Sequence, residues 1–462
     1  MQAGQWEILP GMKTDSVGFN GPYLGPTIRF REGQDVHLSY TNHWSESVAV
    51  HGHGLHVSGA LDGGPQRLIE PGDTWSPVLP IRQQAGTAWY HPHTHGRSGS
   101  QTYKGLAGML LIEDDNSVEL PLPRTYGVDD IPLIVQDRRL DSQSQLAYSL
   151  QNADREGFLG DFVTVNGIAG AEANVPAGLV RLRILNGSNA RFYRFRFADG
   201  RVFHKIATEG GFLPEPVPIQ DLVMLPGERN EILVDCTDGT PAELISGPSL
   251  SRGETRGARR DNERSDGDQS RSNGLSDTFE IVTLRPDPRL PPVRTELPRQ
   301  LNVIERPSIR AEWPRRIFRL NMEVRRDERR RSNRSQDRER RPSTITTDNH
   351  EQTMGINRQP MDMRVINERV HLGQWELWQV EADRRPHPFH VHGCSFLVLE
   401  QGGEQVSDAD AGWKDTVSVS EDTRTTFIVR FDHPATDEFP YMYHCHILEH
   451  EDMGMMGQFT VT

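Results

Sequence analysis

A short stretch near the C-terminus concentrates side chains that bind metals. It reads YHCHILEHEDMGMM and runs from Tyr443 to Met456. Cys445 lies between two histidines, and His450 follows it by five residues. Thiolate, imidazole and thioether groups are soft or borderline metal ligands. Residue types and spacing therefore indicate metal binding, at one site or at several.

Histidine pairs of the form His-x-His recur elsewhere in the chain. They occur at positions 51/53, 91/93, 93/95, 390/392 and 444/446. Residues i and i+2 of a β-strand point to the same face, so each pair would present two imidazoles side by side. One such pair is more often structural or accidental. Separate pairs from both ends of the chain argue against that explanation and favour a shared metal site.

Strand alternation also separates these ligands into two groups. His444 and His446 would share one face, and Cys445 would point to the other. His387 lies an odd number of residues from His390, so it can face the Cys445 side. The first group contains the imidazoles of His51, His53, His91, His93, His390, His392, His444 and His446. The second group contains His387, Cys445, His450 and a methionine.

The two groups point to different copper chemistry. Two histidines and one cysteine thiolate with a weak axial methionine form a blue-copper electron-transfer site. Eight imidazoles are too many for one ion and suit about three copper ions with open positions for dioxygen. The backbone from Cys445 to His444 and His446 would connect the two sites by a short covalent path. A structural zinc site is disfavoured, because such sites are usually cysteine-rich and tetrahedral.

Length and composition predict a β-rich chain of several domains. A chain of 462 residues suggests about three domains, and 42 glycines and 31 prolines favour turn-rich β structure. Strand patterns form three blocks, of which the middle one contains a clear apolar–polar alternation from Leu179 to Gly200. Two polar runs, 251–273 and 325–341, read as solvated segments. The second, Arg-rich run is either a charged loop or a lid that faces a partner or substrate.

Several classes of function are disfavoured. The net charge of -14 argues against nucleic acid as a partner, and no apolar run approaches the ~20 residues of a membrane span. No secretory signal is visible at the start of the sequence. Apart from Cys445, the cysteines are Cys236 and Cys394, which we expect to be buried small apolar residues.

The histidine motifs carry a resemblance to a known family. They read HGHG (51–54), WYHPHTHG (89–96), HPFHVHG (387–393) and HCHILEHEDMGM (444–455). With their order, two in the first block and two in the last, the chain resembles the multicopper oxidases. It is most similar in type to bacterial copper-efflux oxidases and their laccase-like relatives. The segments GPTIRFREG, DGGPQ and GLAGMLLIEDD extend the resemblance through the first block.

The resemblance implies an all-β fold of three cupredoxin-like Greek-key β-sandwich domains. We expect domain 1 over 1–122, domain 2 over 123–295 with the polar segment 251–273, and domain 3 over 296–462 with an Arg-rich insertion at about 325–350. Domains 1 and 3 would share the trinuclear copper cluster, and domain 3 would hold the type 1 copper. Kinship also implies a periplasmic or secreted monomer.

The resemblance further implies four copper ions: one type 1, one type 2 and two type 3. His51 and His390 would bind type 2 copper. The type 3 pair would be bound by His53, His91, His93, His392, His444 and His446. Type 1 copper would be bound by His387, Cys445 and His450, with Met455 axial. Asp62 and Glu451 match acidic positions that relay protons, and His95 falls outside the motif as a loop histidine.

These implications favour an enzyme that oxidises a small donor and reduces dioxygen to water. The expected donor is a phenol or aromatic amine, with cuprous or ferrous ion as the alternative. Arg385 stands where copper-efflux oxidases have methionine, although Asp383 retains their acidic position, and an Arg-lined approach disfavours Cu⁺. A second alternative is the non-enzymatic cell-division type of homologue, which keeps the fold but has lost ligands that are complete here. A two-domain nitrite reductase needs fewer motifs.

Overall fold

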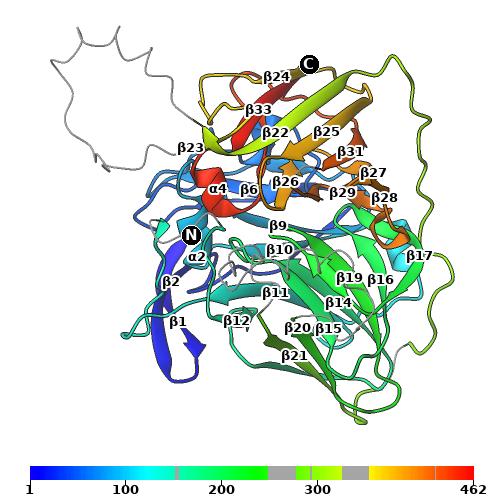
Figure 1. Cartoon of the computed structure of the whole chain (residues 1–462). Helices are drawn as coiled ribbons and strands as arrows, with labels where there is room; N and C mark the ends of the chain where they lie inside the picture. Colours follow the sequence, from blue (N-terminus) through cyan, green and yellow to red (C-terminus); the bar gives the residue numbers. More distant parts are fainter. Residues whose placement is uncertain (151–155, 248–276, 292–293, 325–352, 422) are drawn as a thin grey trace, which may run out of the picture.

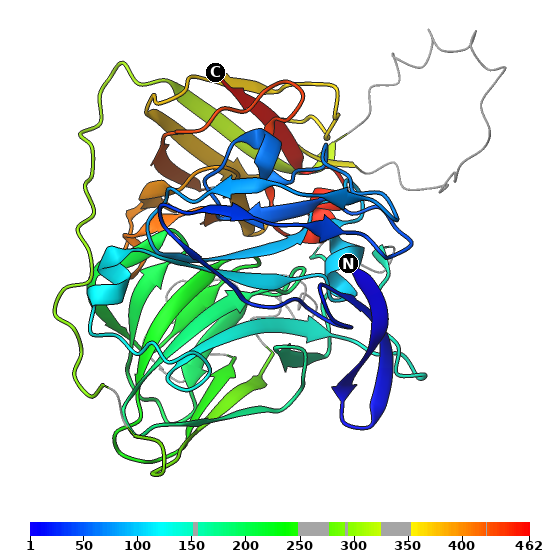
Figure 2. The same ribbon diagram turned by 180° about the vertical axis from the view of Figure 1, so that it is seen from behind.

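The structure of the chain is a computed structural model, shown in Figures 1 and 2. It describes residues 1–462 except 151–155, 248–276, 292–293, 325–352 and 422. The polar segment 251–273 and the Arg-rich insertion at about 325–350 therefore lie outside the described residues. The described chain consists mainly of strands with a few short helices, which confirms the all-β prediction. None of its helices has the length and apolar character needed to cross a membrane.

The first part of the chain builds a four-stranded sheet, with the order β3-β10-β9-β6, and three two-stranded sheets. Its strands are β1 (Gln2–Leu9), β2 (Met12–Gly18), β3 (Ile28–Arg31), β4 (Asp35–His37), β5 (Tyr40–Thr41), β6 (Val50–His53), β7 (Thr74–Trp75), β8 (Val78–Pro80), β9 (Gly86–Pro92) and β10 (Gly108–Glu113). Its short helices are α1 (Gly59–Asp62), α2 (Ser98–Tyr103) and α3 (Asp115–Glu119).

The middle part forms two sheets of six and five strands, with the orders β12-β11-β14-β19-β16-β17 and β13-β21-β20-β15-β18. The strands are β11 (Asp130–Arg138), β12 (Phe162–Val165), β13 (Ala171–Val175), β14 (Leu179–Asn186), β15 (Tyr193–Phe197), β16 (Phe203–Thr208), β17 (Gly211–Ile219), β18 (Leu222–Met224), β19 (Arg229–Asp235), β20 (Ala242–Ser246) and β21 (Phe279–Pro286). Apolar side chains from both sheets form one buried core.

The last part also forms two sheets, with the orders β23-β22-β25-β31-β27-β28 and β24-β33-β32-β26-β30; β29 also pairs with β27. The strands are β22 (Arg315–Val324), β23 (Thr353–Ile356), β24 (Glu368–Val370), β25 (Glu376–Ala382), β26 (His387–Val391), β27 (Phe396–Gln401), β28 (Glu404–Gln405), β29 (Trp413–Lys414), β30 (Thr416–Val419), β31 (Arg424–Val429), β32 (Tyr441–Cys445) and β33 (Met456–Val461). The 3₁₀ turn η5 (Asp408–Asp410) and helix α4 (Leu448–Asp452) complete it.

The three groups of strands are arranged so that the first lies between the other two (Figures 1 and 2). In both views most of the blue and cyan strands cross the middle of the molecule, with the green strands on one side and the orange and red strands on the other, while the dark-blue hairpin of β1 and β2 lies at one edge. The grouping agrees with three domains. The boundaries 1–122, 123–295 and 296–462 remain predictions.

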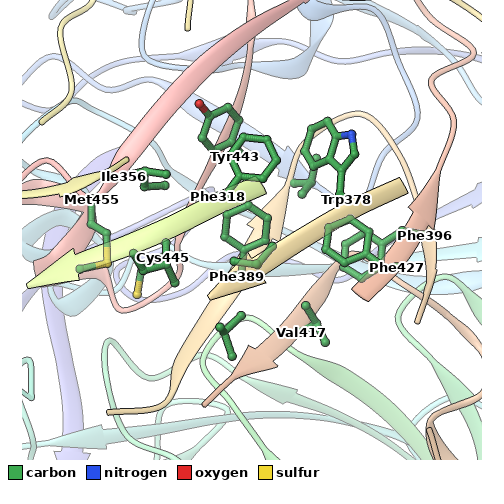
Figure 3. Close-up of a cluster of buried hydrophobic side chains, with 14 of the residues drawn as sticks. Phe318, Ile356, Trp378, Phe389, Phe396, Val417, Phe427, Tyr443, Cys445 and Met455 are labelled. Carbon is green, nitrogen blue, oxygen red and sulfur yellow. The ribbon is translucent and has the colours of Figure 1, made fainter. Parts of the chain in front are cut away.

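The core of the last group is aromatic and extends to the Cys445 side of β32. Phe318 packs against Trp378 and Tyr443, with ring centroids 4.8 and 4.7 Å apart. Cys445 and Met455 belong to the same buried cluster, at one end of it (Figure 3). Close packing of large rings fixes side-chain positions tightly, so this core gives the thiol a rigid surrounding.

The alternating strand β14 is buried on both faces. Its two charged side chains, Arg181 and Arg183, are 4% and 5% exposed. Arg181 Nε donates to Glu231 Oε2 at 2.8 Å, and Arg183 binds both Glu231 and Asp130. Thr87 of β9 donates to the same Glu231 at 2.7 Å. The polar face of β14 therefore packs against the first group of strands through a buried ion network.

Replacing Glu231 by glutamine should destabilise the fold, because two buried guanidinium groups lose a compensating charge. We expect a loss of about 3–5 kcal/mol in the free energy of unfolding, typical of a broken buried pair. Urea unfolding at pH 7 measures it. The exposed Glu172, which pairs with Arg285, offers the matched control Glu172→Gln, which should leave the unfolding midpoint nearly unchanged.

The same variant should change the response to acid. Burial alone would raise the pKa of Glu231, but Arg181 and Arg183 outweigh it and lower the pKa to about 2. The stabilisation is therefore present above the unfolded-state pKa of ~4.3 and is lost as the pH falls toward 2. The stability difference between the unsubstituted protein and Glu231→Gln should shrink over that range. An equal difference at pH 7 and pH 2 would contradict this account.

Candidate copper centres

Strand pairing sets the histidine pairs opposite one another. In the last group of strands, β26 and β32 are antiparallel, with His390 opposite His444 and Phe389 opposite Cys445. In the first group, β6 and β9 place His51 opposite His91. Because side chains alternate along each strand, the imidazoles gather on one face and the cysteine lies on the other. The structure thus separates the two predicted groups of ligands.

The eight predicted imidazoles of the first group meet where the first and last groups of strands join. All of them are at most 1% exposed: His51, His53, His91, His93, His390, His392, His444 and His446. Rings from the two groups of strands stack in pairs. His51 lies on His392 with centroids 3.8 Å apart, and His53 lies on His390 at 3.7 Å. Each half of the cluster is therefore incomplete without the other.

Their nitrogen atoms converge in small sets. Within each set the possible ligand atoms lie within 4.8 Å of one another, and the sets are His51/His53/His390, His53/His91/His446 and His93/His392/His444. His446 Nε2 lies 3.2 Å from His53 Nδ1. The Nε2 atoms of His93 and His392 lie 3.3 and 3.2 Å from that of His444. These sets are consistent with the type 2 and type 3 assignments, which remain predictions.

The hydrogen bonds of these rings show that the site fits metal ions. The Nδ1 atoms of His51, His91 and His390 donate to the carbonyl oxygens of residues 62, 92 and 415 at 2.8–2.9 Å. Their Nε2 atoms are buried and have no hydrogen-bond partner in the described part of the chain. A buried nitrogen without a hydrogen-bond partner costs free energy. In metal sites, the hydrogen bond made by the other ring nitrogen orients the ligating imidazole. The unpaired lone pairs are what copper ions would bind.

Burial also favours the neutral form of an imidazole, which is the form that binds a metal. Desolvation lowers the pKa of His91, His93 and His392 well below the ordinary value, and the neighbouring imidazoles lower it further. A neutral imidazole has a free lone pair, so no proton has to leave before a metal binds.

The second group of ligands lies on the opposite face of β32. His387 Nδ1 and His450 Nδ1 lie 3.4 and 3.5 Å from Cys445 Sγ. Burial lowers the pKa of His387 to about 4 and raises the pKa of the Cys445 thiol. Met455 is fully buried in the same cluster as Cys445 (Figure 3). Two imidazoles, a thiol and a nearby thioether are the donor set of a blue-copper site.

Two acidic residues contact the imidazoles of the first group. Asp62 Oδ2 accepts a hydrogen bond from His392 Nδ1 at 2.8 Å. Glu451 accepts one from Ser98 Oγ at 2.6 Å, and its carboxyl oxygens lie 3.4 Å from the Nδ1 atoms of His93 and His444. Burial, followed by the charge of Asp452, raises the pKa of Glu451 well above its ordinary value. Both carboxyl groups are buried beside predicted ligands.

Sequence reasoning missed a third carboxylate at the cluster. Asp415 Oδ1 accepts a hydrogen bond from His53 Nε2 at 3.0 Å, and Asp415 itself is held by Arg229. Position 415 lies 362 residues from His53 along the chain, and no local motif marks it. Only the packing of the first group of strands against the last brings these residues together.

The remaining candidates lie outside both clusters. His95 is exposed, in agreement with its interpretation as a loop residue. Cys236 and Cys394 are buried free thiols, as expected.

An all-β fold with a cluster of imidazoles and a separate His–Cys–His group defines the class of cupredoxin-like copper proteins. Two family models described as multicopper oxidase match residues 1–117 and 334–462. The chain is similar to the laccase-like multi-copper oxidase CueO from the lignin-degrading bacterium Ochrobactrum sp., with 36% identity, a TM-score of 0.84, and coverage of 100% of this chain and 96% of that one. The chain belongs to the multicopper oxidase family.

Other relatives carry different names. McoA multicopper oxidase from Aquifex aeolicus is 29% identical with a TM-score of 0.81, over 100% of this chain and 94% of that one. The Cell division protein FtsP of Dickeya dadantii is 40% identical over 99% of this chain and 88% of its own length. FtsP of Escherichia coli is 39% identical over 100% of this chain and 88% of its own length.

Copper should stabilise the fold, because the ligands of each cluster are brought together only in the folded chain. At a free copper concentration 100 times the dissociation constant, we expect a gain of ~2.7 kcal/mol per site. Scanning calorimetry of chelator-treated protein with and without added copper measures the shift. Cys445→Ser should lose the blue absorption band, while Cys236→Ser, a buried cysteine far from both clusters in the sequence, should keep it. Equal melting temperatures with and without copper would contradict ligation at either cluster.

Proposed function

We propose that this chain is a laccase-like multicopper oxidase, which couples one-electron oxidation of phenolic or aromatic donors to the four-electron reduction of dioxygen to water. The main support is that the predicted ligands of all four copper ions are present, buried and grouped. When bound, copper would supply reversible one-electron chemistry and open positions for dioxygen. By kinship we also propose export to the periplasm.

The chain connects the two clusters directly. Cys445 and His444 are neighbours in β32, and their side chains lie on opposite faces of that strand. His444 Nδ1 also donates to the carbonyl oxygen of Cys445 at 3.0 Å. One peptide unit and one hydrogen bond therefore join the electron-entry side to the side that faces dioxygen.

Asp62 and Glu451 are placed to handle the protons that water formation consumes. Asp62 uses Oδ2 for His392, and its buried Oδ1 has no partner among the described residues, so this oxygen can hold a proton. Burial raises the pKa of Glu451, which favours the protonated form compared with an exposed carboxyl group, and in that form it can donate a proton.

The surroundings of the second cluster favour an organic donor. Both oxygens of Asp383 already accept hydrogen bonds, from Asn321 Nδ2 and from the Met322 amide, each at 3.1 Å. Met354 is buried, so its thioether is not offered to solvent. Arg385 pairs with Glu156 at 2.8 Å, which offsets its charge. The contacts of Asp383 and the burial of Met354 remove two groups that could bind Cu⁺, which favours an organic donor. The pair between Arg385 and Glu156, by contrast, makes the approach less cationic and weakens the argument from charge against Cu⁺.

A second candidate function is a role in cell division without copper chemistry. It is favoured by the 40% identity to a protein named FtsP over almost the whole chain. The complete set of buried ligands favours the oxidase, because a copper-free protein has no need of it.

Oxygen uptake should distinguish these functions. Copper-loaded protein should consume oxygen faster with a phenol than with Cu⁺, and Cys445→Ser should lose more than 99% of the rate with the phenol. Cys236→Ser serves as the control for loss of a buried thiol and should retain the rate. Faster turnover of Cu⁺ would instead support the cuprous-oxidase alternative. No uptake with either donor, together with normal division in cells that carry only Cys445→Ser, would support the cell-division role.

Asp62→Asn should separate proton handling from copper binding. The amide can keep a contact with His392 but cannot supply a proton, so we expect copper content to stay unchanged and kcat to fall by about 10²-fold. Copper analysis and steady-state oxygen uptake measure the two effects. The exposed Asp73 provides the control Asp73→Asn. A parallel loss of copper and rate would show that Asp62 acts only by holding His392.

A further inference from the structure

The middle group of strands contributes no predicted ligand, yet one of its side chains reaches the imidazole cluster. Arg229 begins β19 and is fully buried. Its Nη1 and Nη2 atoms donate to Asp415 Oδ1 and Oδ2 at 2.9 and 2.6 Å. Its remaining donors bind the carbonyl oxygens of Thr87 and Gly227 at 2.8 and 3.0 Å. The guanidinium is thus held against the carboxylate by two charge-assisted hydrogen bonds.

Asp415 in turn contacts predicted ligands of two different copper types. Its Oδ1 accepts from His53 Nε2 at 3.0 Å, and Thr416 Oγ1 donates to the same oxygen at 2.9 Å. Its main-chain oxygen accepts from His390 Nδ1 at 2.8 Å. One residue therefore orients His53, a predicted type 3 ligand, and His390, a predicted type 2 ligand.

His53 depends on this carboxylate in a way that its neighbours do not. His51, His91, His390 and His444 donate Nδ1–H to carbonyl oxygens and leave Nε2 for a metal. His53 is reversed, because its Nε2 meets Asp415 while its Nδ1 faces His446 at 3.2 Å. A charged acceptor at Nε2 selects the tautomer in which Nδ1 carries the lone pair.

We infer that Arg229 is a positioning residue for the trinuclear cluster, which acts through Asp415 to fix the tautomer and orientation of His53. The inference rests on the copper ligation proposed above. It gives the middle domain a role in the site: its docking sets the geometry of one of the two type 3 positions. A buried Asp415 without its cation would lose both its charge compensation and its orientation.

The neighbouring residue offers a matched control. Lys414 is also buried, and it crosses the same interface to reach Glu209 at 3.0 Å and Glu228 at 3.2 Å. No hydrogen bond is found between its side chain and a predicted copper ligand among the described residues. Lys414→Gln therefore removes a buried ion pair of the same interface without disturbing the support of His53.

The test compares copper-loaded Arg229→Gln, Arg229→Lys and Lys414→Gln with the unsubstituted protein. For Arg229→Gln we expect a 10- to 100-fold loss of copper affinity at the trinuclear cluster, typical when the group that orients a metal ligand is removed. The type 2 paramagnetic resonance signal should change, and the blue band of type 1 copper should stay. Arg229→Lys keeps the charge but loses the paired contact, and it should recover part of the affinity.

Each result has a distinct meaning. Lys414→Gln should lower the melting temperature and leave the copper spectra unchanged. If Arg229→Gln and Lys414→Gln lose trinuclear copper equally, Arg229 serves only the interface and the inference is wrong. It is also wrong if Arg229→Gln binds copper as the unsubstituted protein does. If Arg229→Gln fails to fold, the spectra of Arg229→Lys decide, because unchanged copper spectra there would also overturn it. A failure of the unsubstituted protein to bind copper would overturn the proposed function instead.

Discussion

The alternation of side chains along β32 (Tyr441–Cys445) is the constraint on which both clusters depend. It sends the imidazole of His444 to one face and the thiol of Cys445 to the other. A shift of one residue in its pairing with β26 would exchange the two faces and destroy both groups of ligands at once. The aromatic core around Phe318 and Trp378 holds the thiol side, and this packing keeps the register unique.

The imidazole cluster imposes a second demand, which the surrounding loops meet. Eight buried rings must stay neutral and must each present a defined nitrogen. Main-chain carbonyl oxygens fix four of them, whereas the carboxylates of Asp62 and Asp415 fix His392 and His53. Every residue supplies a main-chain carbonyl oxygen. A buried carboxylate, in contrast, needs hydrogen bonds that fix its position and a positive charge that compensates its own. This is why the cluster involves buried charges from a part of the chain that supplies no ligand.

Features of the site that depend on residues near one another in the sequence could be predicted, whereas contacts between distant residues could not. The His-x-His pairs and their strand parity are local, so the sequence predicts which imidazoles gather and where Cys445 points. The all-β class follows from the same local patterns. Arg229 and Asp415 are 186 residues apart, and their contact depends on how two groups of strands dock. Likewise, the alternation of β14 predicts a polar face, but not that Arg181 and Arg183 are buried against Glu231.

The kinship with proteins named for cell division raises the question of what maintains these ligands. Buried nitrogens that have no partner among the described residues, such as Nε2 of His51 and His390, cost free energy unless a bound group satisfies them. In a copper-free protein the same positions would be more stable with apolar side chains, as they are elsewhere in the core. A function that needs only the fold does not account for them. The energetic cost of the cluster is therefore itself an argument that copper binds there.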